Sequence, residues 1–231
     1  MKSVKKFKPI THVIFDLDGV LLDTEGIYKS VIANIAKRFG KVYTPDITAK
    51  VIGTPERESS RIAVTEMQLP MSVDDFQKEF NKSSHDQFGN LPLIPGAEKL
   101  INHLKYIRIP MAVATSSHRE SYELKAGPHR ELFKAFSHVV CGGDDPEVRH
   151  GKPRPDIFLV CASRFYDKPK PEKCLVFEDS PNGVKAAVAA KMQTVMIPDE
   201  LVPQELRKEA TVVVKCLDQT PLEAFGLPPV E

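Results

Sequence analysis

Short apolar runs alternate with amphipathic segments through the second half of the chain. Five of these runs, rich in β-branched residues, predict strands, and the segments around them predict helices. The predicted strands cover residues 111–115, 137–142, 174–179, 194–197 and 211–214, and the predicted helices cover residues 97–107, 119–126, 155–165, 182–190 and 203–210. Apolar strands joined by helices are typical of a parallel sheet that is covered on both faces.

Residues 24–91 show a different pattern, because every periodic segment in them favours a helix. Ile27, Val31, Ile35 and Phe39 recur every four residues as one apolar stripe, and Gly40 is a typical C-terminal stop. Three further helices are predicted from their N-terminal signals. The first begins at Pro45, and the second has Thr54 as N-cap and Pro55 at the first helical position. The third has Ser72 as N-cap and Asp75 at the third helical position. The stripe indicates packing among these helices.

One more apolar run, "HVIFD" at residues 12–16, precedes the helical segment and matches the strands of the second half. We therefore predict an α/β fold with a doubly wound, Rossmann-like parallel sheet, built by residues 1–22 and 92–231 together. Residues 23–91 are predicted to form an all-helical cap inserted after the first strand.

Composition and charge argue against several classes of protein. The net charge is +1 and the basic residues are spread along the chain, which disfavours binding to a nucleic acid polymer or an anionic membrane. No run approaches the roughly 20 apolar residues that span a bilayer. The four cysteines form no CxxC pair, as expected for reduced thiols. We expect a cytoplasmic protein, and a monomer because such a cap does not require a partner chain.

Polar residues gather where predicted strands end. They are Asp16 and Asp18 after the first strand, Thr115, Ser116 and Ser117 at the end of the second, and Glu178 and Asp179 at the end of the strand 174–179, with Lys152 in the loop "RHGKPRPD". Because ligands of open parallel sheets bind outside the carboxyl ends of the strands, we expect these side chains to converge.

The chemistry of this cluster suits phosphoryl transfer. Residues two apart in an extended chain point to the same side, so Asp16 and Asp18 can face one ligand. Several carboxylates without histidine or cysteine favour Mg²⁺ over zinc. A carboxylate held by the metal can attack phosphorus, and a second carboxylate can move the proton. Lys152 can balance phosphoryl charge, and the Thr115 hydroxyl with the following helix N-terminus can hold phosphate oxygens.

At these residues the chain resembles the haloacid dehalogenase-like superfamily of phosphohydrolases. The stretches "DLDGVLLD", "VATSS", "GKPRPD" and "FEDSPNG" match its four motifs in order and spacing, and the helical insertion sits where cap type one belongs. The resemblance implies that Asp16 is the nucleophile and Asp18 the general acid/base. It also implies phosphate binding by Thr115, Ser116 and Lys152. It further implies a Mg²⁺ ion held by Asp16, the Asp18 carbonyl and Asp179, with Glu178 assisting directly or through water.

Other stretches resemble the pseudouridine-5′-phosphatase family, among them "LPLIPGAEKLINHL", "GGDDPEVRHGKPRPDIF" and the tail "FGLPPVE". The resemblance implies a small phosphomonoester substrate, with pseudouridine 5′-phosphate the leading candidate. One departure is Lys191, where that family usually has glycine, and a left-handed helix terminus there would cost a non-glycine residue roughly 1 kcal/mol of stability. The cap segment "IGTPERESSRI" is less similar to the family.

Several alternatives stay open. A phosphatase for another nucleotide or sugar phosphate, a phosphosugar mutase on the same core, and a binding module without catalysis are each compatible with the fold. Arg57 could contact a substrate, but an exposed arginine on a helix explains it at least equally well. Asp144 and Asp145 are better explained by a turn before the Lys152 loop than by metal binding. Thr24 lies where a hinge to the cap is expected.

Overall fold

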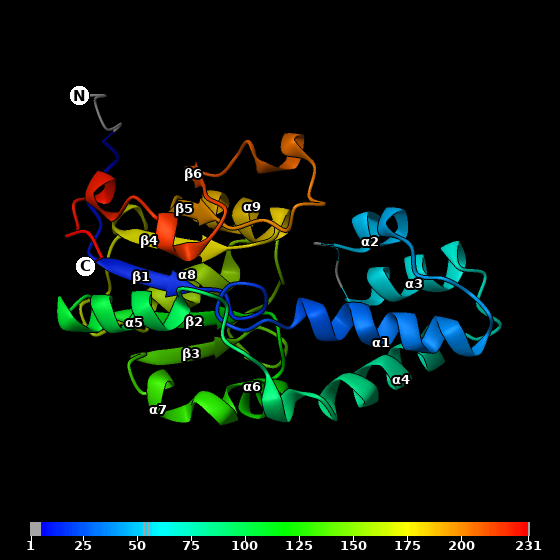
Figure 1. The fold of residues 1–231 in the computed structure, drawn as a ribbon. Coiled ribbons are helices and arrows are strands. Elements are labelled where there is room, and N and C mark those ends of the chain that lie inside the picture. Colours follow the sequence, from blue (N-terminus) through cyan, green and yellow to red (C-terminus); the bar gives the residue numbers. More distant parts are fainter. Residues whose placement is uncertain (1–5, 53, 55, 231) are drawn as a thin grey trace.

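Six parallel strands form one sheet in the computed structural model, which describes residues 6–230 except residues 53 and 55 (Figure 1). The strand order is β3-β2-β1-β4-β5-β6, so the first strand lies in the middle of the sheet. The strands are β1 (His12–Phe15), β2 (Met111–Thr115), β3 (His138–Cys141), β4 (Cys174–Glu178), β5 (Gln193–Met196) and β6 (Val212–Val213). Ile14 pairs with Ala112 on one side and with Val176 on the other. The predicted doubly wound parallel sheet is confirmed.

Helices cover the sheet on both faces. Successive residues of a strand point to opposite sides, so each apolar strand presents side chains to both helical layers. Val13 and Phe15 pack in the cluster that contains α5 (Ala97–Tyr106), α6 (Arg119–Ala126) and α7 (Arg130–Phe133). Ile14 packs on the other face with α8 (Asp156–Ser163) and α9 (Pro181–Ala189). This double coverage explains why the central strands lack a polar face.

Four helices between β1 and β2 form a separate block beyond the carboxyl ends of the strands (Figure 1). They are α1 (Glu25–Arg38), α2 (Pro45–Val51), α3 (Glu56–Glu66) and α4 (Val73–His85). The block has its own apolar core, to which Val31, Ala63 and Phe76 belong. The chain enters and leaves it side by side, since Leu22 forms an antiparallel bridge with Leu93. The predicted helical insertion is therefore present.

The local signals in this block are confirmed in part. The Ser72 hydroxyl accepts a hydrogen bond from the Asp75 N–H at 3.0 Å, as expected for an N-cap. Pro55, predicted at the start of α3, lies outside the described residues. Including Phe39 in the buried stripe was wrong: α1 ends at Arg38 and the Phe39 side chain is exposed. Ile32 and Ala36 fill the stripe instead, because 3.6 residues per turn shift the buried face away from strict steps of four.

The C-terminal region differs from its prediction. The helix expected at 203–210 is a single 3-10 turn, Gln204–Arg207, and the strand expected at 211–214 has two residues. The Arg207 guanidinium donates to the carbonyls of Asp199 and Glu200, and so holds the segment as a loop. Short 3-10 turns at 88–90, 127–129, 171–173, 217–219 and 222–225 and the short helix α7 were not predicted.

Lys191 has a φ of 64°, so this non-glycine residue adopts the left-handed conformation just after α9. The four cysteines are free thiols. Within the described part of the chain, every helix is too short or too polar to cross a membrane.

Candidate active site

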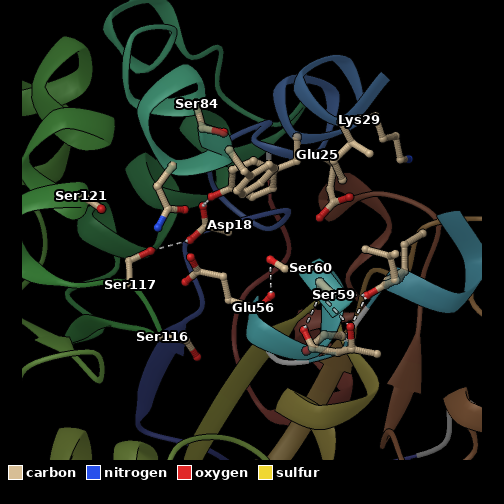
Figure 2. A pocket seen from close by; sticks show the side chains of 18 of the residues that line it. Asp18, Glu25, Lys29, Glu56, Ser59, Ser60, Ser84, Ser116, Ser117 and Ser121 are labelled. Atoms are coloured by element: carbon tan, nitrogen blue, oxygen red, sulfur yellow. Dashed lines mark hydrogen bonds between the residues drawn. The ribbon is translucent and has the colours of Figure 1, made fainter. Parts of the chain in front are cut away.

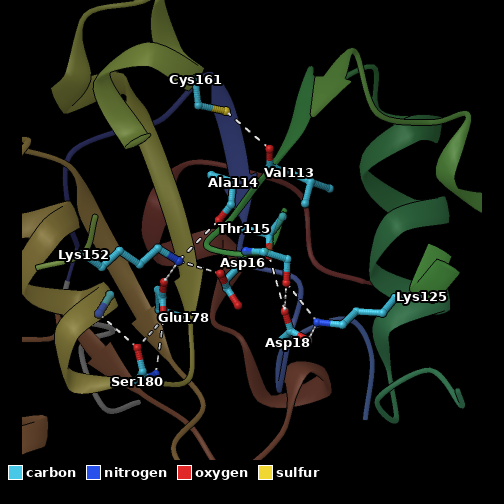
Figure 3. A network of polar contacts seen from close by, with 12 residues as sticks. Asp16, Asp18, Val113, Ala114, Thr115, Lys125, Lys152, Cys161, Glu178 and Ser180 are labelled. Atoms are coloured by element: carbon cyan, nitrogen blue, oxygen red, sulfur yellow. Dashed lines mark hydrogen bonds and ion pairs between the residues drawn. The ribbon is translucent and has the colours of Figure 1, made fainter. Parts of the chain in front are cut away.

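Lys152 joins two strand ends at the centre of the site. Its ammonium nitrogen lies 2.5 Å from Asp16 Oδ1 and 2.5 Å from Glu178 Oε1, and 3.3 Å from the Ala114 carbonyl (Figure 3). Asp16 directly follows β1, Glu178 ends β4, and Lys152 arrives from the loop between β3 and α8. The ammonium also lies 5.1 Å from the centre of the Phe158 ring. The predicted convergence of these three residues at one edge of the sheet is what the structure shows.

Three buried or half-buried carboxylates meet beside this lysine. Asp16, Glu178 and Asp179 each offer an oxygen, and these oxygens lie within 4.8 Å of one another. Burial raises the pKa of Asp16 to about 7: the Lys152 charge opposes the rise, and the Glu178 and Asp18 charges add to it. Burial, with the Glu178 and Asp16 charges, also holds the pKa of Asp179 well above its usual range. One lysine does not neutralise this group, so the site suits a hard divalent cation.

Two glycines make room for these carboxylates. Gly19 has a φ of 74°, and a Cβ at this position would overlap the Asp179 carboxylate. A Cβ at Gly183, in the first turn of α9, would overlap the Glu178 carboxylate. The turn after β1 and the start of α9 can therefore approach the acids only because both residues lack side chains.

Glu178 has few free hydrogen-bonding positions. Its Oε1 accepts from Lys152, and its Oε2 accepts from the Ser180 N–H at 3.3 Å and the Ser180 hydroxyl at 3.1 Å. Its side chain is fully buried. The carboxylate is thus fixed in place, and it fixes the Lys152 ammonium in turn.

Asp18 has a cationic partner that the sequence analysis missed. The Lys125 ammonium lies 2.6 Å from Asp18 Oδ1 and 2.9 Å from the Ser117 hydroxyl, which itself donates to Asp18 Oδ2 at 3.2 Å. Burial raises the pKa of Asp18, but the charge and hydrogen bond of Lys125 outweigh it, so the pKa lies below its usual range. Burial lowers the pKa of Lys125, and the Asp18 charge outweighs this and raises it.

A signal for Lys125 was present in the sequence. Tyr122, Lys125 and Ala126 form the buried face of α6, so this lysine stands among apolar positions on an amphipathic helix. Lysine is almost never fully buried unless it is paired. The helix that carries Lys125 directly follows the hydroxyl residues at the end of a strand. A lysine on the apolar face of such a helix therefore indicates a buried acidic partner.

Thr115 and Ser116 differ in how they enter the site. Thr115 is fully buried, and its hydroxyl donates to Asp18 Oδ2 at 3.4 Å and accepts from the Ser117 N–H at 3.1 Å. Ser116 is exposed and lines the cavity beside these residues (Figure 2). The N-cap of α6 is His118, so Thr115 does not cap that helix.

A cavity of about 570 Å³ separates the strand ends from the helical block. Asp16, Asp18, Lys152 and Asp179 line it from the sheet side. Side chains of α1, α3 and α4, among them Glu25, Glu56 and Ser84, line it from the opposite side (Figure 2). The size is that of a site for a small molecule.

Three other residues singled out in the sequence lie outside the cluster. Arg57 pairs with Asp74 at 2.9 Å on the exposed surface. Asp145 accepts two hydrogen bonds from Arg164, at 2.6 and 2.8 Å. Asp144 accepts from the Arg119 N–H at 2.9 Å. The two aspartates therefore shape the turn before the Lys152 loop, as expected.

The chain is similar to known hydrolases and phosphatases. The family model described as haloacid dehalogenase-like hydrolase matches residues 13–197. A protein of Drosophila melanogaster named probable pseudouridine-5′-phosphatase is 46% identical over 97% of this chain and 97% of its own. The (DL)-glycerol-3-phosphatase 2 of Arabidopsis thaliana is 45% identical over 96% of this chain and 93% of its own.

A solved structure has the same fold. The haloacid dehalogenase family hydrolase of Deinococcus radiodurans, crystallised with bound phosphate and sodium, superposes with a TM-score of 0.77 at 25% identity. The match covers 96% of this chain and 100% of that one. The chain thus belongs to the haloacid dehalogenase-like hydrolase family, and within it is a phosphoric monoester hydrolase, a phosphatase of phosphorylated metabolites.

Proposed function

We propose that this phosphatase is Mg²⁺-dependent and works through an aspartyl-phosphate formed on Asp16. The observation that carries the proposal is the position of the Asp16 carboxylate. It lies on the cavity floor, held at 2.5 Å by Lys152, with a second aspartate two residues further along the chain. This arrangement pairs a nucleophile with a proton carrier at one point.

The residues present suit a magnesium ion. The candidate donors are all oxygens, the carboxylates carry more negative charge than Lys152 balances, and Gly19 leaves room for Asp179. We propose Asp16, the Asp18 main-chain carbonyl and Asp179 as ligands. Glu178 is the weaker candidate, because both of its oxygens already accept hydrogen bonds. When bound, the ion would neutralise phosphoryl charge as a Lewis acid.

The reaction follows in two steps. In the first, an Asp16 oxygen bonds to phosphorus and the bond from phosphorus to the leaving oxygen breaks. Asp18 must enter this step in its protonated form, and it donates that proton to the leaving oxygen. In the second, Asp18 takes a proton from water, the water oxygen bonds to phosphorus, and the bond to Asp16 breaks. Asp16 returns to the carboxylate form and inorganic phosphate leaves.

Three residues are proposed to hold the phosphoryl oxygens. Lys152 supplies a fixed positive charge next to the nucleophile, while Thr115 and Ser116 stand at the end of β2. The start of α6 follows them directly, and helix N-termini favour anions. Phosphoryl charge would thereby be stabilised by the fixed Lys152 ammonium and by strand-end hydroxyls, of which Thr115 would turn from Asp18 to the phosphate.

For the substrate we propose pseudouridine 5′-phosphate, with glycerol phosphate as the second candidate. The two relatives whose names carry these activities are 46% and 45% identical to this chain, so identity alone does not separate them. We also propose that residues 23–91 act as a cap on a core of residues 1–22 and 92–231. Closure of the cap would exclude bulk water during phosphoryl transfer.

Phosphate release from a panel of monophosphates tests this proposal. The panel contains pseudouridine 5′-phosphate, uridine 5′-phosphate and sn-glycerol 3-phosphate, each with and without Mg²⁺. We expect release only with the metal and the highest kcat/KM for pseudouridine 5′-phosphate. A kcat/KM for uridine 5′-phosphate equal to that for pseudouridine 5′-phosphate would reject the proposed specificity, and release that is unchanged by a chelator would reject the metal dependence.

A further inference from the structure

The cap side of the cavity carries an acidic group without a partner. Glu25, at the start of α1, lines the cavity, and its carboxylate points into it (Figure 2). Among the described residues, no hydrogen bond or ion pair engages this carboxylate. Glu56 of α3 also lines this side, and its carboxylate accepts from Gln77 at 3.1 Å. The side facing the leaving group therefore bears negative charge.

The cations of the cavity are already paired. Among the described lysines and arginines, those that line it are Lys29, Lys125 and Lys152. Lys125 pairs with Asp18 and Lys152 with Asp16, both at the phosphoryl end. Lys29 is the one on the cap side, and its ammonium lies 2.7 Å from Asp199 Oδ2. A second anionic group on a substrate would thus meet Glu25 beside a lysine whose charge already acts on both Asp199 and Glu25.

A buried hydroxyl on the same side lacks a partner. Ser84 of α4 lines the cavity, is 1% exposed, and makes no hydrogen bond through its hydroxyl in the described structure. A buried hydroxyl without a partner is unfavourable, so a ligand that bonds to it gains affinity. A carboxylate that accepts and a serine that donates or accepts are together suited to the hydroxyl groups of a neutral ligand.

We propose that the cap side selects a neutral, hydroxylated leaving group and rejects substrates with a second anionic group, with Glu25 as the specificity-determining residue and Ser84 as its hydrogen-bonding neighbour. This inference rests on the proposed function and narrows its substrate class. It also bears on the phosphosugar mutase alternative. Return of a phosphoryl group from Asp16 to a sugar monophosphate makes a bisphosphate, whose second phosphate would have to lie against Glu25.

Matched pairs of phosphomonoesters test the inference by binding. In sn-glycerol 1-phosphate and 3-phospho-D-glycerate, which share one configuration at C2, only a hydroxymethyl and a carboxylate differ. The second pair is uridine 5′-phosphate and uridine 3′,5′-bisphosphate. Calorimetry on Asp16→Asn with Mg²⁺ gives the dissociation constants without turnover. We expect the member with one anionic group to bind at least about tenfold more tightly in each pair.

Three variants in the same background locate the selectivity. Glu25→Gln is expected to lower the ratio of dissociation constants at least about threefold, because it removes the charge and keeps the shape. Asp199→Asn is expected to lower it as well, since it releases Lys29 toward the cavity. Glu58→Gln is the control, because Glu58 pairs with Arg61 and does not line the cavity.

The inference would be overturned if the two compounds of a pair bound with equal affinity or if no compound bound. It would also be overturned if Glu25→Gln left the ratio of the two dissociation constants unchanged. Turnover by the wild-type enzyme separates this outcome from failure of the proposed function. If both members of a pair release phosphate equally well, the phosphatase stands and the charge selection falls. If Mg²⁺ supports no release from any compound while the affinities differ as expected, the proposed function fails and the charge selection stands.

Discussion

The Lys125 ammonium lies 2.6 Å from Asp18 Oδ1, although 107 residues separate the two in the chain. The same nitrogen lies 5.6 Å from the centre of the Tyr28 ring and 5.0 Å from that of Phe88. Tyr28 belongs to α1 of the helical block, and its hydroxyl also donates to Asp18, at 3.4 Å. The orientation of Asp18 is therefore coupled to the position of the helical block through the buried Lys125 and through the Tyr28 hydroxyl.

Replacing Lys125 with methionine is expected to lower kcat about 10- to 100-fold with a smaller change in KM. Methionine keeps the length of the side chain but no longer orients Asp18, and well-positioned acid–base catalysis contributes factors of about 10² to 10⁴. Steady-state kinetics on protein with an unchanged circular dichroism spectrum would measure this. Lys125→Arg should retain more activity than Lys125→Met. Equal losses in both variants would show that Lys125 only fills space.

Gly183→Ala is expected to reduce both stability and activity, because the added methyl group overlaps the Glu178 carboxylate. Overpacking of this kind costs roughly 1–3 kcal/mol of unfolding free energy. Displacement of Glu178 would also release its contact to Lys152. Gly127→Ala is the control, since a Cβ there meets no atom within 4 Å. Urea unfolding and turnover on both variants check the prediction, and similar results for the two would refute it.

Features of the fold and the site that depend on local sequence patterns were predictable, whereas contacts between residues far apart in the sequence were not. The strands and the cluster of Asp16, Lys152 and Asp179 were predicted, because apolar runs and strand-end polar residues are local patterns that the topology brings together. The contacts of Lys125 were not, since a lysine within a helix is usually solvated and its partner lies far away in the sequence. The single turn at Gln204–Arg207 was wrongly predicted as a longer helix. The hydrogen bonds from Arg207 to loop carbonyls leave no trace in the hydrophobic periodicity of the sequence. Cytoplasmic location and the monomeric state stay predictions.

Mg²⁺ is expected to stabilise the folded protein independently of turnover. Three carboxylates meet beside one lysine, and a cation that binds only the folded state adds about 2.7 kcal/mol at 100 times its dissociation constant. Thermal unfolding with Mg²⁺ or with a chelator would measure this as a rise in Tm. Asp179→Asn should lose most of the rise, while Asp144→Asn should keep it. An unchanged rise in Asp179→Asn would remove Asp179 from the metal site.

Acidification is expected to destabilise the fold through His138. Burial lowers the pKa of its imidazole, the Cys161 carbonyl that contacts Nε2 at 2.9 Å opposes this, and Arg164 adds to it. The pKa of histidine in the unfolded chain is about 6.5. Below this pH the unfolded chain binds a proton that the folded protein does not bind, so the free energy of unfolding falls as the pH is lowered. His138→Gln should show a shallower fall between about pH 7.5 and 5.5 than wild type. Equal slopes in urea unfolding would contradict this assignment.

The proposed role of Asp16 is tested most directly by comparing two aspartates of the stretch "IFDLDGVLLD". Asp16→Asn removes the proposed nucleophile, whereas Asp23→Asn changes an aspartate where the chain enters the helical block. Among the described residues, the Asp23 carboxylate accepts one hydrogen bond, from the Gly26 N–H at 3.4 Å. Phosphate release from pseudouridine 5′-phosphate would be measured for both with Mg²⁺. We expect a loss of at least about 10³-fold in kcat for Asp16→Asn and a rate close to wild type for Asp23→Asn. Turnover by Asp16→Asn at the wild-type rate would contradict the proposed role of Asp16.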